Sequence, residues 1–326
     1  MKIDALNQLA PAGLLSDEDV LTPMQRWRAA GHRVALVTLV GVEGGAPREP
    51  GAQMAVAEDG RYVGYLSGGC LEDSVVLEAR AVIAAGRNRL VRYGKGSPYL
   101  DIRLPCGSGL DLYFDQTITT DQLAAMADHR AHRRSFVLET DIAAHRCAIA
   151  RKDAPASRRI GDVFERAYTP PLQLLLLGSG PGLVAIATLA DALGIGLKIH
   201  STDPATRASL GLTGRRALID EPSLAAAIAG ADAATAVILV FHEHERELDL
   251  LADVLATDCF YVGALGNHAI HRERRTALVA RGVTDAHLDR IRAPIGSIPG
   301  AKSKATLAVG VLAELMTEAR ARKLVS

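Results

Sequence analysis

Apolar residues follow two different patterns along this chain, and the change falls near residue 170. In the first part, helical spacing alternates with short β-branched runs, separated by turn signals such as Glu58-Asp59-Gly60-Arg61. The expected helices are residues 17–30, 71–85 and 121–130. The expected strands are 33–40, 53–57, 62–66, 90–93, 110–114, 135–139 and 147–151. This half of the chain therefore predicts a mixed α+β domain.

The second part alternates regularly between apolar strands and helices. The expected strands are 172–177, 197–201, 237–241 and 259–262, and the expected helices are 181–193, 245–256 and 268–280. Strands that are apolar throughout suit a parallel sheet covered on both faces. The predicted fold class is thus α/β, with an N-terminal α+β domain followed by a Rossmann-like, doubly wound domain.

A polar segment with several prolines, residues 153–171, separates the two patterns. The boundary is expected near Thr169-Pro170-Pro171, because proline punctuates regular structure. We therefore predict domains at residues 1–168 and 169–326.

Charge and composition exclude several classes of function. Lys+Arg and Asp+Glu both total 37, so the basic excess of a nucleic-acid-binding protein is absent. The longest apolar stretch, Leu224–Phe241, is split by Gly230 and Asp232, which predicts a helix end followed by a strand and no membrane span. The first residues do not resemble a secretory signal, so a cytoplasmic location is expected.

The four cysteines are far apart and form no CxxC pair, so a zinc ribbon or a thioredoxin motif is not supported. Cys70 follows a glycine-rich stretch that contains Gly44, Gly45, Gly68 and Gly69, and it directly precedes a helical pattern. A thiol at a helix entry is favoured as thiolate, which indicates an anionic or metal-bearing ligand. The alternative is a tight turn followed by a buried cysteine.

A second glycine turn opens the C-terminal domain. The run LLLLGSGPG supplies Gly178, Gly180 and Gly182 at the end of a strand, and Asp203 follows Gly182 by 21 positions. This context is typical of a dinucleotide fingerprint, although Leu183 stands where the last glycine of that motif belongs. The turn predicts a phosphate-bearing ligand, with NAD(P) or another nucleotide as one hypothesis.

Several motifs, in order, resemble one known family. GAPREPGAQM, GYLSGGCLE, LLLLGSGP, IHSTDP, VFHEHERELD, YVGALGNHAIHRERRTAL and RIRAPIG are similar to the XdhC/CoxI-type xanthine dehydrogenase accessory family. The chain departs from the family pattern at GSGPG, where a GAGHV-type turn is usual. It departs again after RIRAPIG, where Lys302 and Lys304 replace a Pro-Glu region.

The resemblance implies an accessory chaperone, not an enzyme. Such a protein binds molybdenum cofactor in its molybdopterin form, protects it during sulfuration and delivers it to a xanthine dehydrogenase-like molybdenum hydroxylase. The implied partners are the hydroxylase apoenzyme, a cysteine desulfurase-type sulfur donor and a second copy of the chain, as in a dimer. The alternatives are an NAD(P)-dependent oxidoreductase and a Rossmann module that binds nucleotide as a structural or sensing ligand.

The candidate cofactor-binding residues come from both domains, and no catalytic set is predicted. They are Gly44, Gly45, Arg48, Gly68, Gly69, Cys70, Glu72, Cys106, Gly107, Gly178, Gly180, Gly182, Asp203, His242, Gly263 and Gly266. Cys70 and Cys106 are the candidate metal ligands, because two thiolates facing one pocket would suit molybdenum.

Each candidate also has a simpler structural interpretation. Arg48 suits phosphate capture but could be a solvated loop charge. Glu72 is expected to cap a helix, with acid/base chemistry as an alternative. His242 lies at a strand's carboxyl end, where ligands bind in α/β sheets. A helix beginning at His268 is expected to present Arg274 and its neighbouring charges to solvent.

Overall fold

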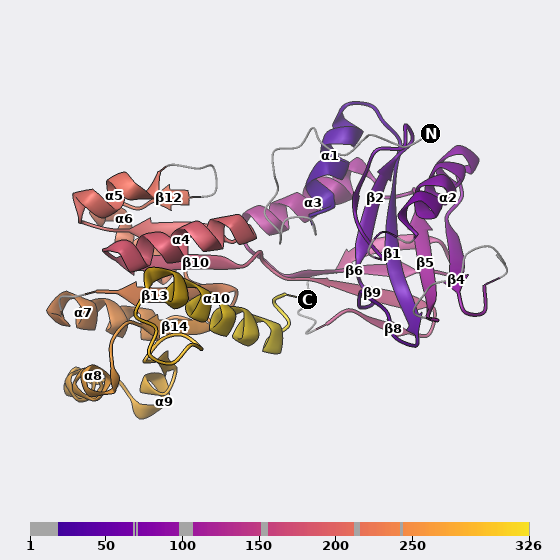
Figure 1. The fold of residues 1–326 in the computed structure, drawn as a ribbon. Coiled ribbons are helices and arrows are strands. Elements are labelled where there is room, and N and C mark those ends of the chain that lie inside the picture. Colours follow the sequence, from indigo (N-terminus) through magenta and orange to yellow (C-terminus); the bar gives the residue numbers. More distant parts are fainter. Residues whose placement is uncertain are drawn as a thin grey trace. The chain divides into compact units, whose positions relative to one another are not determined.

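The computed structural model describes residues 19–67, 69, 71–97, 107–150, 156–211, 216–241 and 244–325. These residues form two compact units that divide between Pro170 and Pro171. Figure 1 shows the helices and strands of both units, and each unit has its own hydrophobic core. The predicted fold class, an N-terminal α+β part followed by a parallel-sheet α/β part, is confirmed.

The N-terminal unit is built on a five-stranded antiparallel sheet of order β3-β2-β1-β5-β4. Its strands are β1 (Val34–Glu43), β2 (Gln53–Ala57), β3 (Tyr62–Gly64), β4 (Arg89–Gly94) and β5 (Gly109–Asp115). Helix α2 (Glu72–Ala85) buries Val75, Val76 and Ile83 on one face of this sheet, and Gly86 ends the helix in the left-handed conformation. Helices α1 (Leu21–Ala29) and α3 (Thr120–Ala131) contribute to a second apolar cluster.

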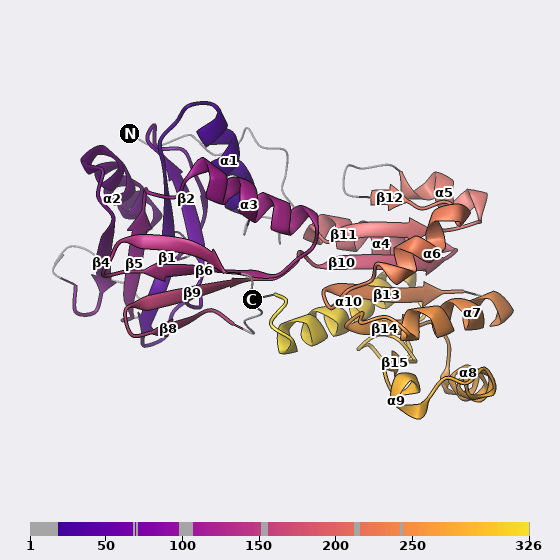
Figure 2. The same ribbon diagram turned by 180° about the vertical axis from the view of Figure 1, so that it is seen from behind.

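A second antiparallel sheet, of order β7-β6-β9-β8, completes this unit (Figure 2). Its strands are β6 (Phe136–Asp141), β7 (Arg146–Ala150), β8 (Arg158–Ile160) and β9 (Val163–Tyr168). Strands β8 and β9 lie within the polar segment 153–171 and were not predicted. The residues of β8 are exposed, and β9 buries the charged Glu165 beside Phe164, so the hairpin lacks the alternation of apolar and polar positions that indicates a strand.

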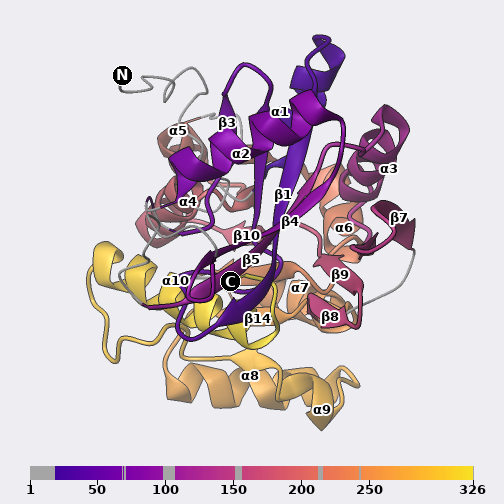
Figure 3. The same ribbon diagram turned by 90° about the vertical axis from the view of Figure 1, so that its right-hand side faces the viewer.

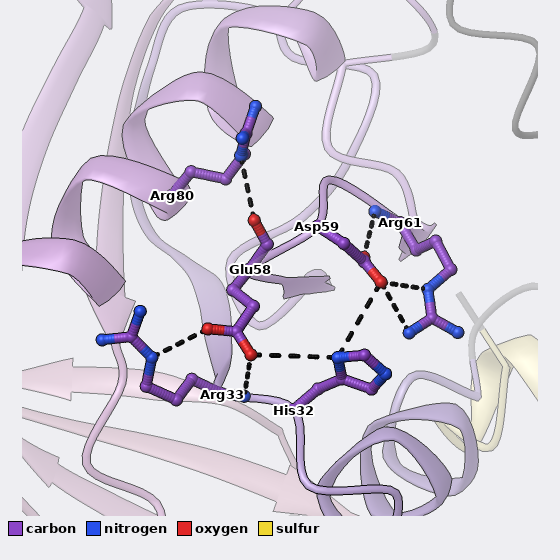
Figure 4. Close-up of polar contacts among 6 residues, drawn as sticks. All are labelled: His32, Arg33, Glu58, Asp59, Arg61 and Arg80. Atoms are coloured by element: carbon purple, nitrogen blue, oxygen red, sulfur yellow. Dashed lines mark hydrogen bonds and ion pairs between the residues drawn. The ribbon is translucent and has the colours of Figure 1, made fainter.

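The predicted hairpin turn at Glu58–Arg61 is present and is fixed by charge (Figure 4). The backbone N–H and Nε of Arg33 donate to the Glu58 carboxylate at 3.1 and 2.8 Å. Arg61 binds the Asp59 carboxylate in the same two ways, and His32 Nδ1 lies 3.8 Å from Glu58 Oε1. The Arg33 side-chain hydrogen bond is the main reason that the pKa of Glu58 is lowered. These contacts tie the β2–β3 turn to the start of β1.

The C-terminal unit is a six-stranded parallel sheet of order β12-β11-β10-β13-β14-β15. Its strands are β10 (Gln173–Gly178), β11 (Gly196–His200), β12 (Arg216–Leu218), β13 (Thr235–Val240), β14 (Tyr261–Ala264) and β15 (Ile291–Arg292). Counted within the unit, this is the order 3-2-1-4-5-6 of doubly wound dinucleotide-binding folds.

Helices cover both faces of the parallel sheet (Figure 3). The helices are α4 (Pro181–Leu193), α5 (Pro204–Leu210), α6 (Glu221–Ala229), α7 (His244–Leu255), α8 (His268–Ala280), α9 (Asp285–Leu288) and α10 (Lys304–Ala321). Helices α4, α5 and α10 share one apolar cluster, and α6, α7, α8 and α9 share the other. Two buried faces explain why the strands are apolar throughout. In the described part of the chain, no helix has the length and apolar character needed to cross a bilayer.

Candidate functional site

The glycine-rich segments of the N-terminal unit leave the same end of its five-stranded sheet. Strand β1 ends at Glu43, which pairs with Gly109 at the start of β5, and Gly109 in turn pairs with Gly94 at the end of β4. Strand β3 ends at this end as well, because Gly64 pairs with Met54 near the start of β2. The antiparallel register therefore brings the described residues 44–52, 65–67, 69, 71, 95–97 and 107–108 to one end of the sheet, which we call the glycine edge.

Side chains and backbone join these segments to one another. A Cβ added to Gly44 would lie 3.6 Å from Ser108 Cα, so the first and third segments are in contact. Arg48 Nη1 donates to the Tyr65 hydroxyl at 2.8 Å, and its guanidinium carbon lies 4.5 Å from the centre of the Tyr65 ring. Arg48 therefore connects the first segment to the second. Tyr65 was not among the predicted site residues, although it directly precedes the LSGGC motif.

Glu72 organises the segment that contains Cys70. Its carboxylate is buried and accepts hydrogen bonds from the backbone N–H of Leu66, Ser67, Gly69 and Leu71 at 2.9–3.1 Å. The Ser67 hydroxyl donates a fifth at 2.8 Å. Burial alone would raise the pKa of Glu72, but these donors outweigh it and the pKa is lowered. The side chain is therefore held ionised as a clamp on the loop, which goes beyond the helix cap expected from sequence.

Open backbone surface is a further property of the glycine edge. A Cβ added to Gly45, Gly69 or Gly107 would meet no atom of the described residues within 4 Å, and Gly69 and Gly107 have φ of 106° and 67°. Gly68, Cys70 and Cys106 lie outside the described residues, so the predicted metal ligands stay predictions. Their described neighbours Gly69, Leu71 and Gly107 lie in segments that leave the glycine edge.

Basic side chains accompany these turns. Arg92 Nη1 donates to Asp111 Oδ1 at 3.0 Å and Nη2 to Glu43, while Lys95 Nζ lies 2.8 Å from Glu43 Oε1. Gly109 has no room for a side chain, because an added Cβ would lie 2.5 Å from Arg92 Nη2. Arg92 and Lys95 were not predicted as site residues. The signal that could have revealed them is the pair of basic residues flanking the end of β4.

The other two cysteines differ from the predicted ligands in their surroundings. Cys147 is half-buried on β7, and burial raises the pKa of its thiol to about 12. Cys259 is buried beneath α7, and burial likewise raises its pKa. Both thiols are therefore protonated at neutral pH and inert as nucleophiles.

The glycine turn of the C-terminal unit is held mainly by contacts inside the protein. Gly178 has φ of 128°, and an added Cβ would lie 2.0 Å from the Val240 carbonyl oxygen. The Ser179 N–H donates to that same carbonyl at 2.9 Å, and the Gly180 N–H donates to Thr206 Oγ1 at 2.8 Å. Two amides that a phosphate would use in a dinucleotide fold are thus already engaged.

Asp203, expected to face a ribose hydroxyl, is the N-cap of α5. Its Oδ2 accepts from the Thr206 N–H at 2.9 Å and from the Thr206 hydroxyl. These hydrogen bonds lower the pKa of Asp203. The chain of contacts from Asp203 through Thr206 to Gly180 fixes the turn to α5.

The remaining candidates that the structure describes in this unit lie at or near the carboxyl ends of the parallel strands. Gly182 packs against Leu307 of α10, and Gly266 follows β14 with φ of 142°. Gly263 lies inside β14, not in the turn, where an added Cβ would meet Ile295 at 2.3 Å. His242 lies outside the described residues. The ligand roles of all four remain predictions.

Arg274 corrects the sequence interpretation of α8. Its side chain is 2% exposed, and Nη2 donates to Glu247 Oε1 and to the Leu265 carbonyl, both at 2.8 Å. It is therefore a buried anchor between α7, α8 and the turn after β14, not part of a solvated face. Its partner, Glu247, is 27 residues away in the sequence, so no local sequence pattern indicates this ion pair.

No group of three or more His, Cys, Asp or Glu side chains that could hold a metal ion occurs among residues 19–67, 69, 71–97, 107–150, 156–211, 216–241 and 244–325. The described part of the glycine edge offers the Arg48 guanidinium and open backbone, which suit an anionic ligand.

Known proteins share these two units in the same order. The chain matches the model of the XdhC and CoxI family over residues 27–94 and that of the XdhC Rossmann domain over residues 174–315. It is 36% identical over 289 residues to the molybdenum cofactor insertion chaperone PaoD of Escherichia coli (strain K12), covering 88% of this chain and 83% of PaoD.

More distant relatives agree with that match. A probable xanthine dehydrogenase subunit of Bacillus subtilis (strain 168) is 24% identical over 314 residues, covering 87% of this chain and 93% of the relative. The crystal structure of a xanthine dehydrogenase (BH1974) from Bacillus halodurans superposes with a TM-score of 0.72 at 19% identity, covering 93% and 96% of the two chains, and shows a shared fold. The resemblance read from the motifs is confirmed, and the chain belongs to the XdhC and CoxI family.

Proposed function

We propose that this protein binds molybdenum cofactor and inserts it into a molybdenum hydroxylase of the xanthine dehydrogenase type. The observation that carries the proposal is the 36% identity, over most of both chains, to a relative named molybdenum cofactor insertion chaperone. The relative from Bacillus subtilis, which is named as part of a probable xanthine dehydrogenase, supports the class of partner.

The glycine edge is the binding face in this proposal. Molybdopterin carries a phosphate, a flat pterin and a dithiolene that holds the metal. Arg48 offers positive charge for the phosphate, whereas Arg92 and Lys95 are already paired with Glu43 and Asp111. Gly45, Gly69 and Gly107 leave backbone open to a close approach. Cys70 and Cys106, carried by segments that leave this edge, would supply soft sulfur ligands near molybdenum.

The residues of the edge suit retention of a cargo better than turnover. Glu72 is saturated with five donors and its pKa is lowered, so it cannot exchange protons near neutral pH. A carrier needs different affinities in its loaded and releasing states and has no need of transition-state stabilisation. In the proposed cycle the protein protects the cofactor while a cysteine desulfurase-type donor supplies sulfur, then releases it to the apoenzyme. We propose that it acts in the cytoplasm as a homo-oligomer.

One observation favours nucleotide binding as a second candidate function. The strand order 3-2-1-4-5-6 is that of NAD(P)-binding sheets. Against nucleotide binding, the N–H groups of Ser179 and Gly180 and the carboxylate of Asp203 already make hydrogen bonds within the protein. Bound nucleotide is therefore an outcome that the test below must distinguish.

The test measures what the purified full-length protein carries. Protein from molybdate-fed cells is denatured, and molybdenum, fluorescent oxidised pterin and NAD(H) are quantified per chain. We expect molybdenum and pterin in equal amounts, several-fold less of both in Cys70→Ala, and no change in the control Cys147→Ala, whose thiol is half-buried on β7. Stoichiometric NAD(H) without pterin would refute the proposal.

A further inference from the structure

A cavity of about 580 Å³ lies in the N-terminal unit, away from the glycine edge. Its walls include Val82 and Ala85 at the end of α2, Arg87 before β4, Arg89 at the start of β4, Thr117 after β5, and His145 in the β6–β7 turn. Strand β4 begins and β5 ends here, so the cavity is at the opposite end of the sheet from Gly94 and Gly109. Its volume is typical of small-molecule sites.

A polar network holds one side of the cavity. Asn88 is buried, and its Nδ2 donates to Asp115 Oδ1 and Thr117 Oγ1, both at 3.0 Å, while its Oδ1 accepts from the Gln116 N–H. Asn88 Nδ2 also lies 3.3 Å from the hydroxyl of Tyr113. The segment that carries Thr117 is therefore fixed to the start of β4 by one side chain.

The same network orients His145. The Tyr113 hydroxyl lies 3.3 Å from His145 Nδ1, and the two rings are within 13° of parallel. Burial is the main cause that raises the pKa of Tyr113 to about 12, so this hydroxyl keeps its proton and can donate it to Nδ1. With Nδ1 as acceptor, the ring N–H is on Nε2, which does not contact Tyr113 and can donate to a ligand.

His145 occupies a backbone conformation that disfavours it. Its φ is +55°, in the left-handed region where hairpin turns ordinarily place glycine or asparagine. The turn is held by the Ala144 N–H, which donates to Asp141 Oδ1 at 2.8 Å, and by the contact with Tyr113. A histidine kept at such a position suggests that its ring has a use.

The charge of the cavity wall indicates the kind of ligand. Arg89 Nη1 is paired with Glu78 Oε1 at 2.7 Å, so these two charges cancel. Arg87 is exposed, and among the residues that the structure describes it has no hydrogen bond or ion pair. Arg87 and His145 Nε2 are thus two donors at one rim, beside the apolar surface of Val82 and Ala85.

We propose that this cavity is a second ligand site, which binds a small organic anion by its carboxylate or phosphate group through Arg87 and His145, with an apolar body against the end of α2. Arginine recognises both groups with two parallel hydrogen bonds. The site is separate from the proposed cofactor face, because α2 runs from Glu72 near one end of the sheet to Ala85 at the other, about 20 Å at 1.5 Å per residue.

The test follows the ring signals of His145 by NMR in full-length protein with labelled histidine, at fixed pH. The probes are inorganic phosphate, adenosine 5′-monophosphate and benzoate. Comparing the two phosphate-bearing probes with benzoate distinguishes recognition of a phosphate group from recognition of a carboxylate. We expect saturable shifts with at least one probe, weakened at least tenfold in Arg87→Ala. Arg26→Ala, an exposed arginine of α1 outside the cavity, is the matched control and should bind as the unchanged protein does.

A second variant separates binding from folding. His145→Gly suits the backbone conformation better, so its thermal unfolding midpoint should not fall, yet it should lose the Arg87-dependent binding measured by calorimetry. Absence of saturable shifts with all three probes would overturn the proposal. Equal binding by the unchanged protein and by a folded Arg87→Ala or His145→Gly variant would also overturn it.

Discussion

Replacing Glu72 by Gln should loosen the Cys70-bearing loop while leaving the rest of the fold in place. The amide can keep its oxygen toward Leu66 and Ser67, but its NH₂ group then faces the N–H groups of Gly69 and Leu71, which the carboxylate accepts at 2.9 and 3.1 Å. Hydrogen bonds to a charged group contribute about 1.5–3 kcal/mol each. Because the Ser67 hydroxyl can rotate and Leu71 also donates to it at 2.8 Å, we expect a net loss of about 2–4 kcal/mol.

Amide hydrogen exchange of residues 66–71, read by mass spectrometry, measures this loss locally. A change of 2–4 kcal/mol corresponds to exchange about 30- to 1,000-fold faster, at 1.4 kcal/mol per factor of ten. The matched control is Asp73→Asn, the exposed neighbour in the same helical turn, which should change exchange by less than about fivefold. Exchange in Glu72→Gln within the range of this control would refute the clamp.

The sign of the pH dependence follows from the lowered pKa of Glu72. The clamp's contribution is complete above the unfolded-state value near 4.5 and is lost as pH falls through the lower folded value. Protection of the loop, corrected for the intrinsic exchange rate, should therefore persist from pH 7 to about 5 and fall only below about 4.5. The Glu72→Gln protein should lack this acid transition.

Three further predictions concern the C-terminal unit and the thiols. Gly178→Ala should lower stability by about 3 kcal/mol or more, because its Cβ would overlap the Val240 carbonyl, whereas Gly31→Ala, with φ of 87° and open space, should cost about 1 kcal/mol in the same thermal unfolding experiment. Arg274→Met removes the cation that binds the buried Glu247 carboxylate and should cost about 3–5 kcal/mol, against less than about 1 kcal/mol for Arg275→Met, whose side chain is partly exposed and pairs with the exposed Asp289; equal unfolding midpoints would contradict this. Iodoacetamide at pH 7.5 should label Cys70 well before Cys147 and Cys259, whose thiol pKa values are raised, and equal labelling rates would remove Cys70 from the candidate site.

The periodicity of apolar residues predicted most helices and strands, because burial of one or both faces of an element imposes that periodicity. Helix α4 was predicted with the bounds that the structure has, since its apolar period, its Pro181 start and its Gly194 stop are all local signals. Strands β8 and β9 were not predicted, because β8 is three exposed residues and β9 buries a charged residue, Glu165, beside Phe164. Strand β15 and helix α9 are too short to leave a period at all.

The candidate site was predictable only as separate pieces. Glycine clusters near residues 44, 69 and 107 are visible in the sequence, but their meeting depends on the register of β1 with β5 and of β4 with β5, which local patterns do not specify. Asp203 was expected to bind a ribose hydroxyl, but its carboxylate instead accepts hydrogen bonds from the N–H and hydroxyl of Thr206, three residues later. Arg274 was expected in solvent because its burial depends on Glu247, on another helix.

The central claim is that the protein delivers molybdenum cofactor, and reconstitution of an apo-hydroxylase tests it most directly. Purified cofactor-loaded protein is titrated into an apo molybdenum hydroxylase of the xanthine dehydrogenase type, and substrate oxidation is followed. We predict restored hydroxylase activity that saturates near one cofactor per active site. Absence of restored activity, together with steady NAD(P)-dependent hydride transfer by the purified protein alone, would contradict the account.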